Sequence, residues 1–410
     1  MKILFSSQHF WPENFPTNDL AQALVERELE VDVLTGKPNY PQGQYYPGYR
    51  GLGCQRESWA GVSVFRVPLA ARGNGSALRL ALNYASFIVS GLVCAPWLLR
   101  RRTYSVIFVY GSSPILQALP GLFLGWLKRC PVILWVQDLW PDSLEATGYV
   151  HNPRILKAVE HLVRFIYRHA DLLLVQSRAF ESPVAKLASG TPIAYYPNSV
   201  DAVFCAERVG AAPDIPGLKA AFPVLFAGNI GTAQAVEIIV EAAALLRDHP
   251  DIHFLVVGDG VKRDWLQEQV TVRGLTSVSV PGSYPVAEMP GVLQQAAVLL
   301  VTLADRPAFR ATVPSKVQTY MAMGRPIVAS LNGEGARLVK EANAGLAAPA
   351  EDAGALAQAL LQLYRMAPAE REELGANGRR YFEMHFERSR LVDRLLGHFR
   401  AFTDTDGAER

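Results

Sequence analysis

A serine and a lysine follow a proline in the stretch VPSKVQTYMAMGRPIVAS, residues 313–330. Proline is tolerated in the first turn of a helix, so Pro314 predicts a helix start, and the Gly-Arg-Pro at 324–326 predicts its end. Lys316 then lies in the first turn, where the helix dipole favours anions by about 0.3–1 kcal/mol. A phosphate would reconcile the two, because backbone N–H groups, the Ser315 hydroxyl and the Lys316 ammonium could converge on it. The alternative is an ordinary solvated surface lysine.

Two glycine-rich turns follow apolar runs in the same half of the chain, FAGNIGTAQAVE and VVGDGVKRDW. Such turns let backbone N–H groups approach a phosphate, although each is equally well an ordinary strand-to-helix turn. With the PSK segment they give three phosphate-compatible segments in one domain. The candidate phosphate-binding residues in these turns are Gly228, Asn229, Gly231, Gly258, Lys262 and Arg263.

Carboxylates and amides take the corresponding places in the N-terminal half. FWPENFPTND follows the first apolar run and lacks the G-x-G-x-x-G of a dinucleotide site, but it offers Glu13, Asn14 and Asn18 for hydroxyl groups. WVQDLWPDSLEATG supplies Asp138 and Asp142 beside tryptophans. Carboxylates next to aromatic surface are typical of sugar sites, while Asp138 would serve equally as a helix cap or a turn residue.

The elements that position these residues alternate between short apolar runs and helical patterns. KILFSS, EVDVLTG, SVIFVYG, PVILWVQD and DLLLVQS come first, and FPVLFAGNIG, HFLVVGDG, VSVPGSY, AVLLVTL and PIVAS follow a looser Ala-, Pro- and Gly-rich stretch at 198–217. This alternation predicts an α/β protein with parallel sheets covered by helices. We expect domains at 1–200 and 201–385, and an amphipathic C-terminal helix at 386–410 that packs back on the body.

The composition excludes several classes of protein. The 410 residues contain 40 Lys+Arg and 38 Asp+Glu, so the charge footprint of a general nucleic-acid binder is missing. Four dispersed cysteines without a C-x-x-C motif indicate a reduced, cytoplasmic chain without a structural zinc site. The N-terminus MKILFSSQHFW has no cleavage pattern and is interpreted as a first strand.

One segment is unusually apolar. Residues 80–99 carry no charge and are followed by Arg100, Arg101 and Arg102. The length would suffice to cross a bilayer, although polar residues and Pro96 interrupt it. The other two interpretations are a buried helix and a helix lying in the membrane surface, with its arginines on anionic headgroups.

The order of these motifs resembles a known family. FAGNIG, VVGDG, VPSK and YMAMGRPIVAS, with PNSVD in the linker and FWPEN near the start, look like the family 4 retaining glycosyltransferases of GT-B fold. Within that family the chain resembles bacterial O-antigen and capsule N-acetyl-fucosaminyl transferases, over essentially its whole length. The resemblance implies two Rossmann-like domains facing a central cleft, a UDP-sugar on the C-terminal domain, an acceptor sugar on the N-terminal domain, and no bound metal ion or cofactor.

The chain departs from the family pattern at two sets of positions. Many members carry two glutamates eight positions apart, where this chain has Ala311 and Thr319. Many also have an Arg and a Lys in the first glycine turn, where Asn229 and Gln234 stand here. Lys316 must then supply much of the positive charge at the donor phosphates, with Lys262, Arg263 and Arg310 as helpers.

The resemblance also suggests roles in catalysis. Lys316, Ser315 and the turn at 228–231 would stabilise charge on the departing nucleoside diphosphate. Glu334 would accept hydrogen bonds from donor hydroxyls, or be a carboxylate favoured at a helix start. Asp138, and second Glu13, would orient or deprotonate the acceptor hydroxyl. Without a clear nucleophile, attack on the same face within an ion pair is favoured over a covalent intermediate.

Three functions fit these residues. The favoured one is a sugar transferase that extends a polyprenyl-diphosphate-linked glycan in O-antigen or capsule biosynthesis, peripheral on the cytoplasmic membrane face through residues 78–102. The second is a UDP-sugar 2-epimerase, which would form product from the donor alone. The third is a non-catalytic membrane-surface partner of a polysaccharide assembly complex, which the missing glutamate pair suggests.

Overall fold

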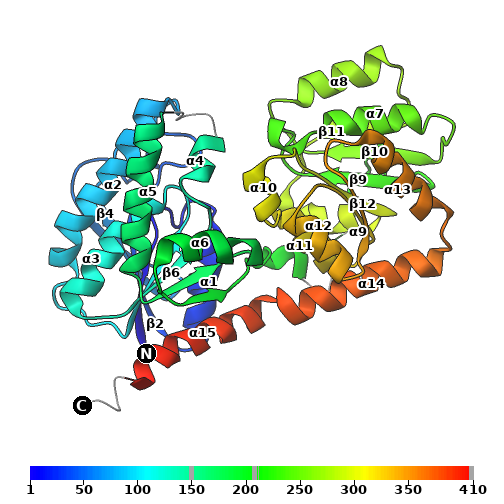
Figure 1. The fold of residues 1–410 in the computed structure, drawn as a ribbon. Coiled ribbons are helices and arrows are strands. Elements are labelled where there is room, and N and C mark those ends of the chain that lie inside the picture. Colours follow the sequence, from blue (N-terminus) through cyan, green and yellow to red (C-terminus); the bar gives the residue numbers. More distant parts are fainter. Residues whose placement is uncertain (147–151, 206–209, 211, 406–410) are drawn as a thin grey trace. The chain divides into compact units, whose positions relative to one another are not determined.

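The computed structural model describes residues 1–146, 152–205, 210 and 212–405, and it divides into two compact units (Figure 1). Unit 1 consists of Met1–Pro197 with Leu391–Arg410, and unit 2 consists of Asn198–Arg390. Each unit is built on a largely parallel sheet with helices on its faces, so the α/β fold class is confirmed.

The sheet of unit 1 has eight strands in the order β3-β4-β2-β1-β5-β6-β7-β8. All neighbours are parallel except the hairpin of β3 and β4. That hairpin was not predicted, because Arg56, Glu57 and Arg66 break the apolar pattern; Arg66 is buried and pairs with Glu57 at 2.5 Å. The strands are β1 Lys2–Ser6, β2 Glu30–Gly36, β3 Gln55–Trp59, β4 Val62–Val67, β5 Val106–Gly111, β6 Val132–Val136, β7 Leu172–Val175 and β8 Ile193–Tyr195.

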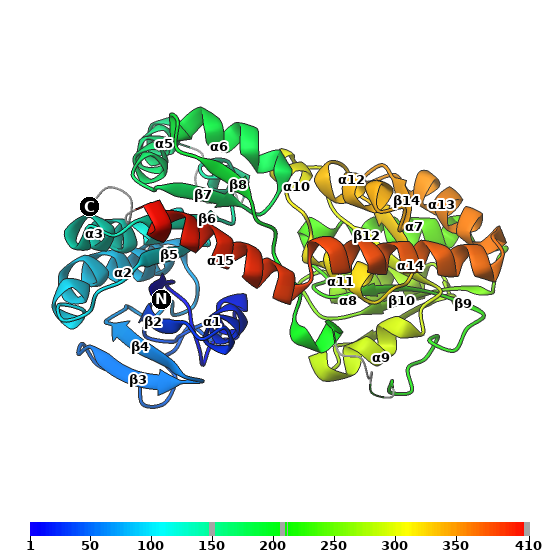
Figure 2. The ribbon, with the colours of Figure 1, turned by 90° about the horizontal axis from the view of Figure 1, so that it is seen from below.

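The helices of unit 1 include the last helix of the chain, α15. The C-terminal part of α15 lies beside the sheet of unit 1 (Figure 2). Its residues Leu391, Leu395 and Phe399 are buried in the same core as β1 and β5, and the ring centroids of Phe399 and Phe108 lie 5.6 Å apart. The helices are α1 Pro16–Glu26, α2 Ala77–Leu98, α3 Leu119–Lys128, α4 Asp142–Ala146, α5 Pro153–Arg168, α6 Glu181–Ala188 and α15 Arg388–Thr405, with short 3-10 turns at Ile115–Ala118 and Arg178–Phe180.

Unit 2 has six parallel strands in the order β11-β10-β9-β12-β13-β14. The strands are β9 Phe222–Ala227, β10 Ile252–Val257, β11 Val278–Gly282, β12 Val298–Thr302, β13 Ile327–Ser330 and β14 Gly345–Ala348. The helices are α7 Glu237–Leu245, α8 Arg263–Val272, α9 Met289–Gln294, α10 Pro307–Ala311, α11 Ser315–Ala322, α12 Glu334–Glu341, α13 Ala353–Arg365 and α14 Pro368–His385, with 3-10 turns at Ala202–Cys205, Thr232–Gln234 and Val286–Glu288.

The sheet order gathers the predicted site residues along one edge in each unit. In unit 2, the segments after β10, β9, β12 and β13 are neighbours, and they contain the two glycine turns, Lys316 and Glu334. In unit 1, the segments after β1, β5 and β6 are neighbours and contain Glu13 and Asp138. Ligands of parallel sheets bind at this carboxyl edge.

The apolar segment 80–99 forms most of α2, which is the one helix of the described residues that is long and apolar enough to cross a membrane. Two of its polar side chains bond to the segment that follows β4. Asn83 Nδ2 donates to Ala70 O at 2.6 Å, and Ser90 Oγ donates to Pro68 O at 2.5 Å. Its buried residues are Asn83, Phe87, Gly91 and Ala95, one narrow stripe at four-residue spacing. The interpretation as a buried helix is therefore wrong, because most of the apolar surface of α2 points outward.

Candidate functional site

Lys316 lies in the first turn of α11, as the sequence predicted, and its helix is fixed to the end of β9. Tyr320, one turn further on, accepts a hydrogen bond from Ala227 N at 3.0 Å, and burial raises the pKa of that phenol. The Lys316 ammonium lies 3.8 Å from the centre of the Phe226 ring. The lysine is thus held over the last residues of β9 by contacts with a strand about ninety positions earlier in the chain.

The glycine turns pack directly against Lys316 and against each other. Gly228 has a φ of 130°, and a Cβ there would lie 2.7 Å from the Lys316 Cε. Gly258 has a φ of 144°, and a Cβ there would lie 1.8 Å from the Gly228 carbonyl oxygen. Only glycine fits at either position. The Gly228 and Gly258 amides donate to Val257 O and Gly282 O at 2.9 and 2.8 Å, so they hold the turns together and do not serve as free phosphate donors.

Asn229 and Gln234, which stand where many family members have cations, bond to one another. The Gln234 Oε1 accepts from Gly231 N at 3.2 Å and from Asn229 Nδ2 at 3.3 Å. These two side chains therefore order the first turn of unit 2 and contribute no positive charge to it.

Three of the four candidate cations already have carboxylate partners. Lys262 pairs with Glu237 at 2.8 Å, Arg263 with Asp259 at 3.9 Å, and Arg310 with Asp305 at 2.6 Å. Lys316 forms no ion pair with any residue that the structure describes. Burial without a counter-charge lowers the pKa of Lys316 to about 7.

Glu334 begins α12 next to this group. A Cβ on Gly335, the second residue of α12, would lie 3.0 Å from Pro314 Cδ, so the starts of α11 and α12 adjoin. Both Glu334 oxygens accept from Arg337, at 2.9 and 2.7 Å. The carboxylate is thus held in place and nearly buried, 7 % exposed. Ser315, Lys316, Gly228 and Glu334 come together at one edge of the unit 2 sheet.

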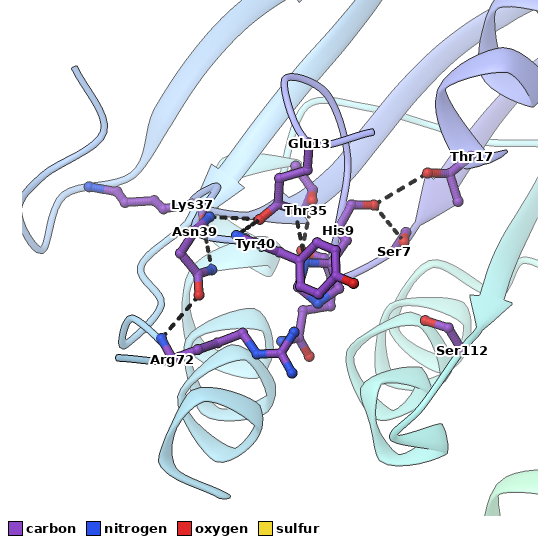
Figure 3. Close-up of polar contacts among 12 residues, drawn as sticks. Ser7, His9, Glu13, Thr17, Thr35, Lys37, Asn39, Tyr40, Arg72 and Ser112 are labelled. Atoms are coloured by element: carbon purple, nitrogen blue, oxygen red, sulfur yellow. Dashed lines mark hydrogen bonds and ion pairs between the residues drawn. The ribbon is translucent and has the colours of Figure 1, made fainter. Parts of the chain in front are cut away.

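In unit 1, Glu13 is buried and fully engaged (Figure 3). One carboxylate oxygen accepts from the backbone amides of Asn39 and Tyr40, at 2.6 and 2.7 Å. The other lies 2.8 Å from His9 Nδ1. A carboxylate that is 1 % exposed and already has three partners is poorly placed to deprotonate an acceptor. Its task in this structure is to fix a loop and an imidazole.

His9 is a further candidate site residue, which the sequence analysis did not single out. Its ring stacks on Phe15 with centroids 4.8 Å apart, while its Nδ1 faces Glu13. Its Nε2 forms no hydrogen bond with a described residue. A carboxylate on Nδ1 selects the tautomer whose Nε2 accepts a proton. The H-x-x-x-E spacing in HFWPE, residues 9–13, is the sequence signal that could have indicated this pair.

The two asparagines of the same loop have different roles. Asn18 is buried and bonds within the loop: its Oδ1 accepts from Trp11 N at 2.9 Å, and its Nδ2 donates to Glu13 O at 2.7 Å. Asn14 is exposed. Of the predicted acceptor-binding residues in this loop, Asn14 alone has its side chain free of such loop contacts.

Asp138 follows β6 and is partly buried. Its Oδ2 accepts from the Ser113 hydroxyl at 2.8 Å, and that hydroxyl accepts from Trp140 Nε1 at 3.0 Å. Burial raises the pKa of Asp138, against the lowering effect of the Ser113 hydrogen bonds. Asp142, four residues on, is exposed at the start of α4. Asp138 is thus a fixed carboxylate with enhanced basicity, beside an aromatic ring.

Comparisons with known proteins identify the family of both halves of the chain. A family model described as "Glycosyl transferase 4-like domain" matches residues 16–199, and one described as "Glycosyl transferases group 1" matches residues 221–366. The chain is 26 % identical over 338 residues to WcaI of Escherichia coli (strain K12), named a colanic acid biosynthesis glycosyl transferase, covering 79 % of this chain and 82 % of WcaI. It is 27 % identical over 305 residues to WbjE of Pseudomonas aeruginosa, named a glycosyltransferase, covering 72 % and 74 %.

A solved structure shows the same fold. Anabaena Alr3699/HepE in complex with UDP superposes with a TM-score of 0.67 over 98 % of this chain and 100 % of that chain, at 16 % identity. The chain thus has the GT-B fold, and its class of enzyme is glycosyltransferase. The chain belongs to glycosyltransferase family 4.

The burial of Glu13 predicts a structural cost for its removal. Glu13→Ala leaves the buried Asn39 amide and the buried His9 Nδ1 without their acceptor, which costs about 1–3 kcal/mol per unsatisfied group. We expect the unfolding midpoint of unit 1 to fall by at least about 4 °C in calorimetry, given about 2–4 °C per kcal/mol for a unit of this size. The exposed Glu181→Ala is the control, with a change of about 1 °C. Equal midpoints for the two variants would refute the role given to Glu13.

Proposed function

We propose that the protein transfers a sugar from a UDP-sugar to a polyprenyl-diphosphate-linked glycan during synthesis of a bacterial surface polysaccharide, with retention at the anomeric carbon. The name of WcaI assigns it to colanic acid biosynthesis, which supports the polysaccharide. The UDP bound by HepE in a related fold supports the nucleotide. An N-acetyl-fucosamine type of sugar is the first donor to test.

The single observation that carries the proposal is the environment of Lys316. A partly buried ammonium without a carboxylate partner is unfavourable until an anion reaches it. The ammonium is fixed over Phe226, beside Gly228 and at the start of a helix. These features suit the diphosphate of a sugar donor. Negative charge grows on that diphosphate as the sugar leaves, and a cation already in position stabilises it.

The other cations play a secondary part in this scheme. Lys262, Arg263 and Arg310 are each neutralised by a neighbouring carboxylate in the absence of donor. Each would have to exchange that partner for a phosphate oxygen, which reduces the net gain. Glu334, held by Arg337, is rigid enough to accept hydrogen bonds from donor hydroxyls.

On the acceptor side we assign Asp138 to the attacking hydroxyl. In the transfer, the acceptor oxygen forms the new bond to the anomeric carbon as the bond to the diphosphate oxygen breaks. The hydroxyl proton passes to Asp138 or to the departing phosphate. The enhanced basicity of Asp138 suits the first route. His9, oriented by Glu13, takes over the hydroxyl contact that the sequence assigned to Glu13, while Asn14 and Asp142 are exposed enough to bind further hydroxyls.

We further propose that the enzyme works at the cytoplasmic membrane face through residues 78–102. The outward face of α2 exposes Leu78, Val89, Val93 and Trp97, and Arg100 and Arg101 follow it on the surface. An apolar face next to arginines suits a bilayer with anionic headgroups. A lipid-linked acceptor explains such a face, whereas an epimerase acting on a soluble nucleotide sugar has no use for it.

Titration calorimetry tests the donor assignment. We expect UDP to bind and GDP and ADP to bind more weakly or not at all. Lys316→Ala should weaken UDP at least tenfold, about 1.4 kcal/mol. Lys219→Ala, an exposed lysine paired with Asp214, is the control and should bind as the wild type does. Equal UDP affinity for the wild type and the Lys316 variant would remove the basis of the proposal.

The lowered pKa of Lys316, about 7, predicts proton uptake on binding. At pH 8 the free lysine is mostly neutral, and the bound diphosphate favours its charged form, so UDP binding should take up nearly one proton. The heats of binding measured in Tris and in phosphate buffer should then differ by nearly the full difference between the ionisation enthalpies of the two buffers. Below pH 6, where the lysine is already charged, its contribution to proton uptake vanishes. In Lys316→Met that contribution is absent at pH 8; an unchanged uptake would assign the proton elsewhere.

Asp138 predicts a dependence of sugar transfer on pH. A base acts when deprotonated, so the rate should fall as the pH drops through the raised pKa of Asp138, at a higher pH than an ordinary carboxylate would give. Asp138→Asn should lose this acid limb and about 10²–10⁴ in transfer rate, with UDP affinity unchanged. Asp142→Asn should keep the limb and raise the acceptor KM. Transfer by Asp138→Asn at the wild-type rate would exclude a base role.

A further inference from the structure

Unit 1 contains an apolar pocket that lies away from the candidate acceptor residues. Its volume is about 950 Å³, within the ~300–1,000 Å³ typical of sites for small organic ligands. Four helices line it, through Leu92 of α2, Leu122 and Trp126 of α3, Phe165 of α5 and Phe402 of α15.

The pocket opens at the amino edge of the sheet. Pro131 and Val132 lie at the start of β6, and Asp171 directly precedes β7; all three line the pocket. Asp138 follows the carboxyl end of β6. The pocket and the acceptor candidates thus lie at opposite ends of the same strands, so the pocket is not a subsite for the acceptor sugar.

The rim of the pocket continues the apolar face of α2. Trp126 lines the pocket and is 75 % exposed, and Phe165 lines it and is 47 % exposed. On α2, Val93 next to the lining Leu92 is 71 % exposed, and Trp97 one turn on is 63 % exposed. Two exposed tryptophans beside an apolar surface are typical of the level where a bilayer meets water.

Cations border the pocket. Lys128 donates to Leu99 O at 2.8 Å and to Arg102 O at 2.7 Å, which joins the end of α3 to the end of α2. The exposed Arg100 and Arg101 therefore lie near Arg129, which itself lines the pocket and is exposed. Arg129 and Arg101 form no ion pair with a described residue. The neighbouring Arg102 does, because its Nη1 lies 3.4 Å from Asp32 Oδ2.

The remaining titratable groups leave the rim cationic. Asp171 is the one acid among the lining residues, and its Oδ2 accepts from Val132 N at 2.7 Å. Besides Arg129, the other titratable lining residues are Cys130, whose thiol is buried, and His169, whose Nδ1 lies 2.8 Å from Phe165 O. An apolar interior with a surplus of arginines at its mouth suits an amphiphile with an apolar chain and an anionic head.

We propose that this pocket receives one acyl chain of an anionic bilayer phospholipid, whose phosphate is held by Arg129 and the neighbouring arginines. The chain of the acceptor lipid is the weaker candidate, because its sugar has to reach Asp138 at the opposite edge of the sheet. The inference extends the membrane contact proposed above and does not depend on which donor the enzyme uses. A captured chain would fix the orientation of unit 1 on the membrane, which adsorption through α2 alone would not.

Two tryptophan substitutions separate capture of a chain from adsorption. Leu92→Trp fills the pocket from α2, whereas Val93→Trp places the same ring next to it on the exposed face. Purified full-length protein is mixed with phosphatidylcholine vesicles that contain phosphatidylglycerol with a photoreactive acyl chain, and crosslinked peptides are mapped by mass spectrometry. We expect crosslinks in residues 119–132 and 165–171, reduced at least fivefold in Leu92→Trp and unchanged in Val93→Trp.

Other outcomes overturn the proposal. Crosslinks confined to residues 77–98, or an equal effect of the two tryptophans, would mean surface adsorption only. Efficient competition by polyprenyl phosphate would assign the pocket to the acceptor lipid. Labelled phosphatidylcholine crosslinking as well as labelled phosphatidylglycerol would refute the selectivity for an anionic headgroup. Arg129→Gln should weaken crosslinking of the labelled phosphatidylglycerol at least threefold. Thermal unfolding and UDP titration of every variant show that it is folded, and they separate a failure here from a failure of the proposed function.

Discussion

Shielding an ammonium group from water without a carboxylate beside it costs free energy, and the structure of unit 2 is arranged around one such group. Lys316 is kept over Phe226 because Tyr320 binds α11 to β9, and because Gly228 leaves the space that its side chain occupies. Gly258 in turn leaves space for the Gly228 carbonyl. The glycines that suggested phosphate contacts in the sequence thus act mainly by allowing three segments to approach closely around one charge.

Unit 1 separates two kinds of surface along the same strands. Its carboxyl edge carries polar groups that are fixed by hydrogen bonds. In the His9–Glu13 pair and in the Asp138–Ser113 pair the bonded atoms lie 2.8 Å apart. Its amino edge carries the apolar pocket with Arg129 at the rim. A parallel sheet makes this division possible, since all strand starts lie on one edge and all strand ends on the other. Under the proposed function, the sugar of the acceptor and the membrane would therefore contact different surfaces of unit 1.

The sequence predicted what depends on local pattern and missed what depends on distant partners. Apolar runs located β1, β2, β5, β6 and β7, and Pro314 located the start of α11. The hairpin of β3 and β4 was missed because the sequence does not show that Arg66 can be buried. Its burial depends on the ion pair with Glu57 on the neighbouring strand. The sequence suggested both Lys316 and Lys262 as cations for the donor phosphates. The structure separates them, because Lys262 pairs with Glu237 and Lys316 does not. Glu13 was predicted because it is a carboxylate after the first strand. Its burial could not be predicted, because it depends on the loop at 37–40, whose Asn39 and Tyr40 amides donate to it.

The position of α15 in the chain determines the order in which the two units can complete their cores during synthesis. Unit 1 takes its first 197 residues from the start of the chain and its last segment, from Leu391 on, from the end. Leu395 and Phe399 are buried against strands that a ribosome completes some three hundred residues earlier. Domains fold as units during synthesis, usually with the N-terminal one first. Here unit 2 is fully synthesised before unit 1 has its whole core, so Phe108 and its neighbours in the nascent unit 1 lack the covering side chains of α15 until residues 391–399 have been synthesised.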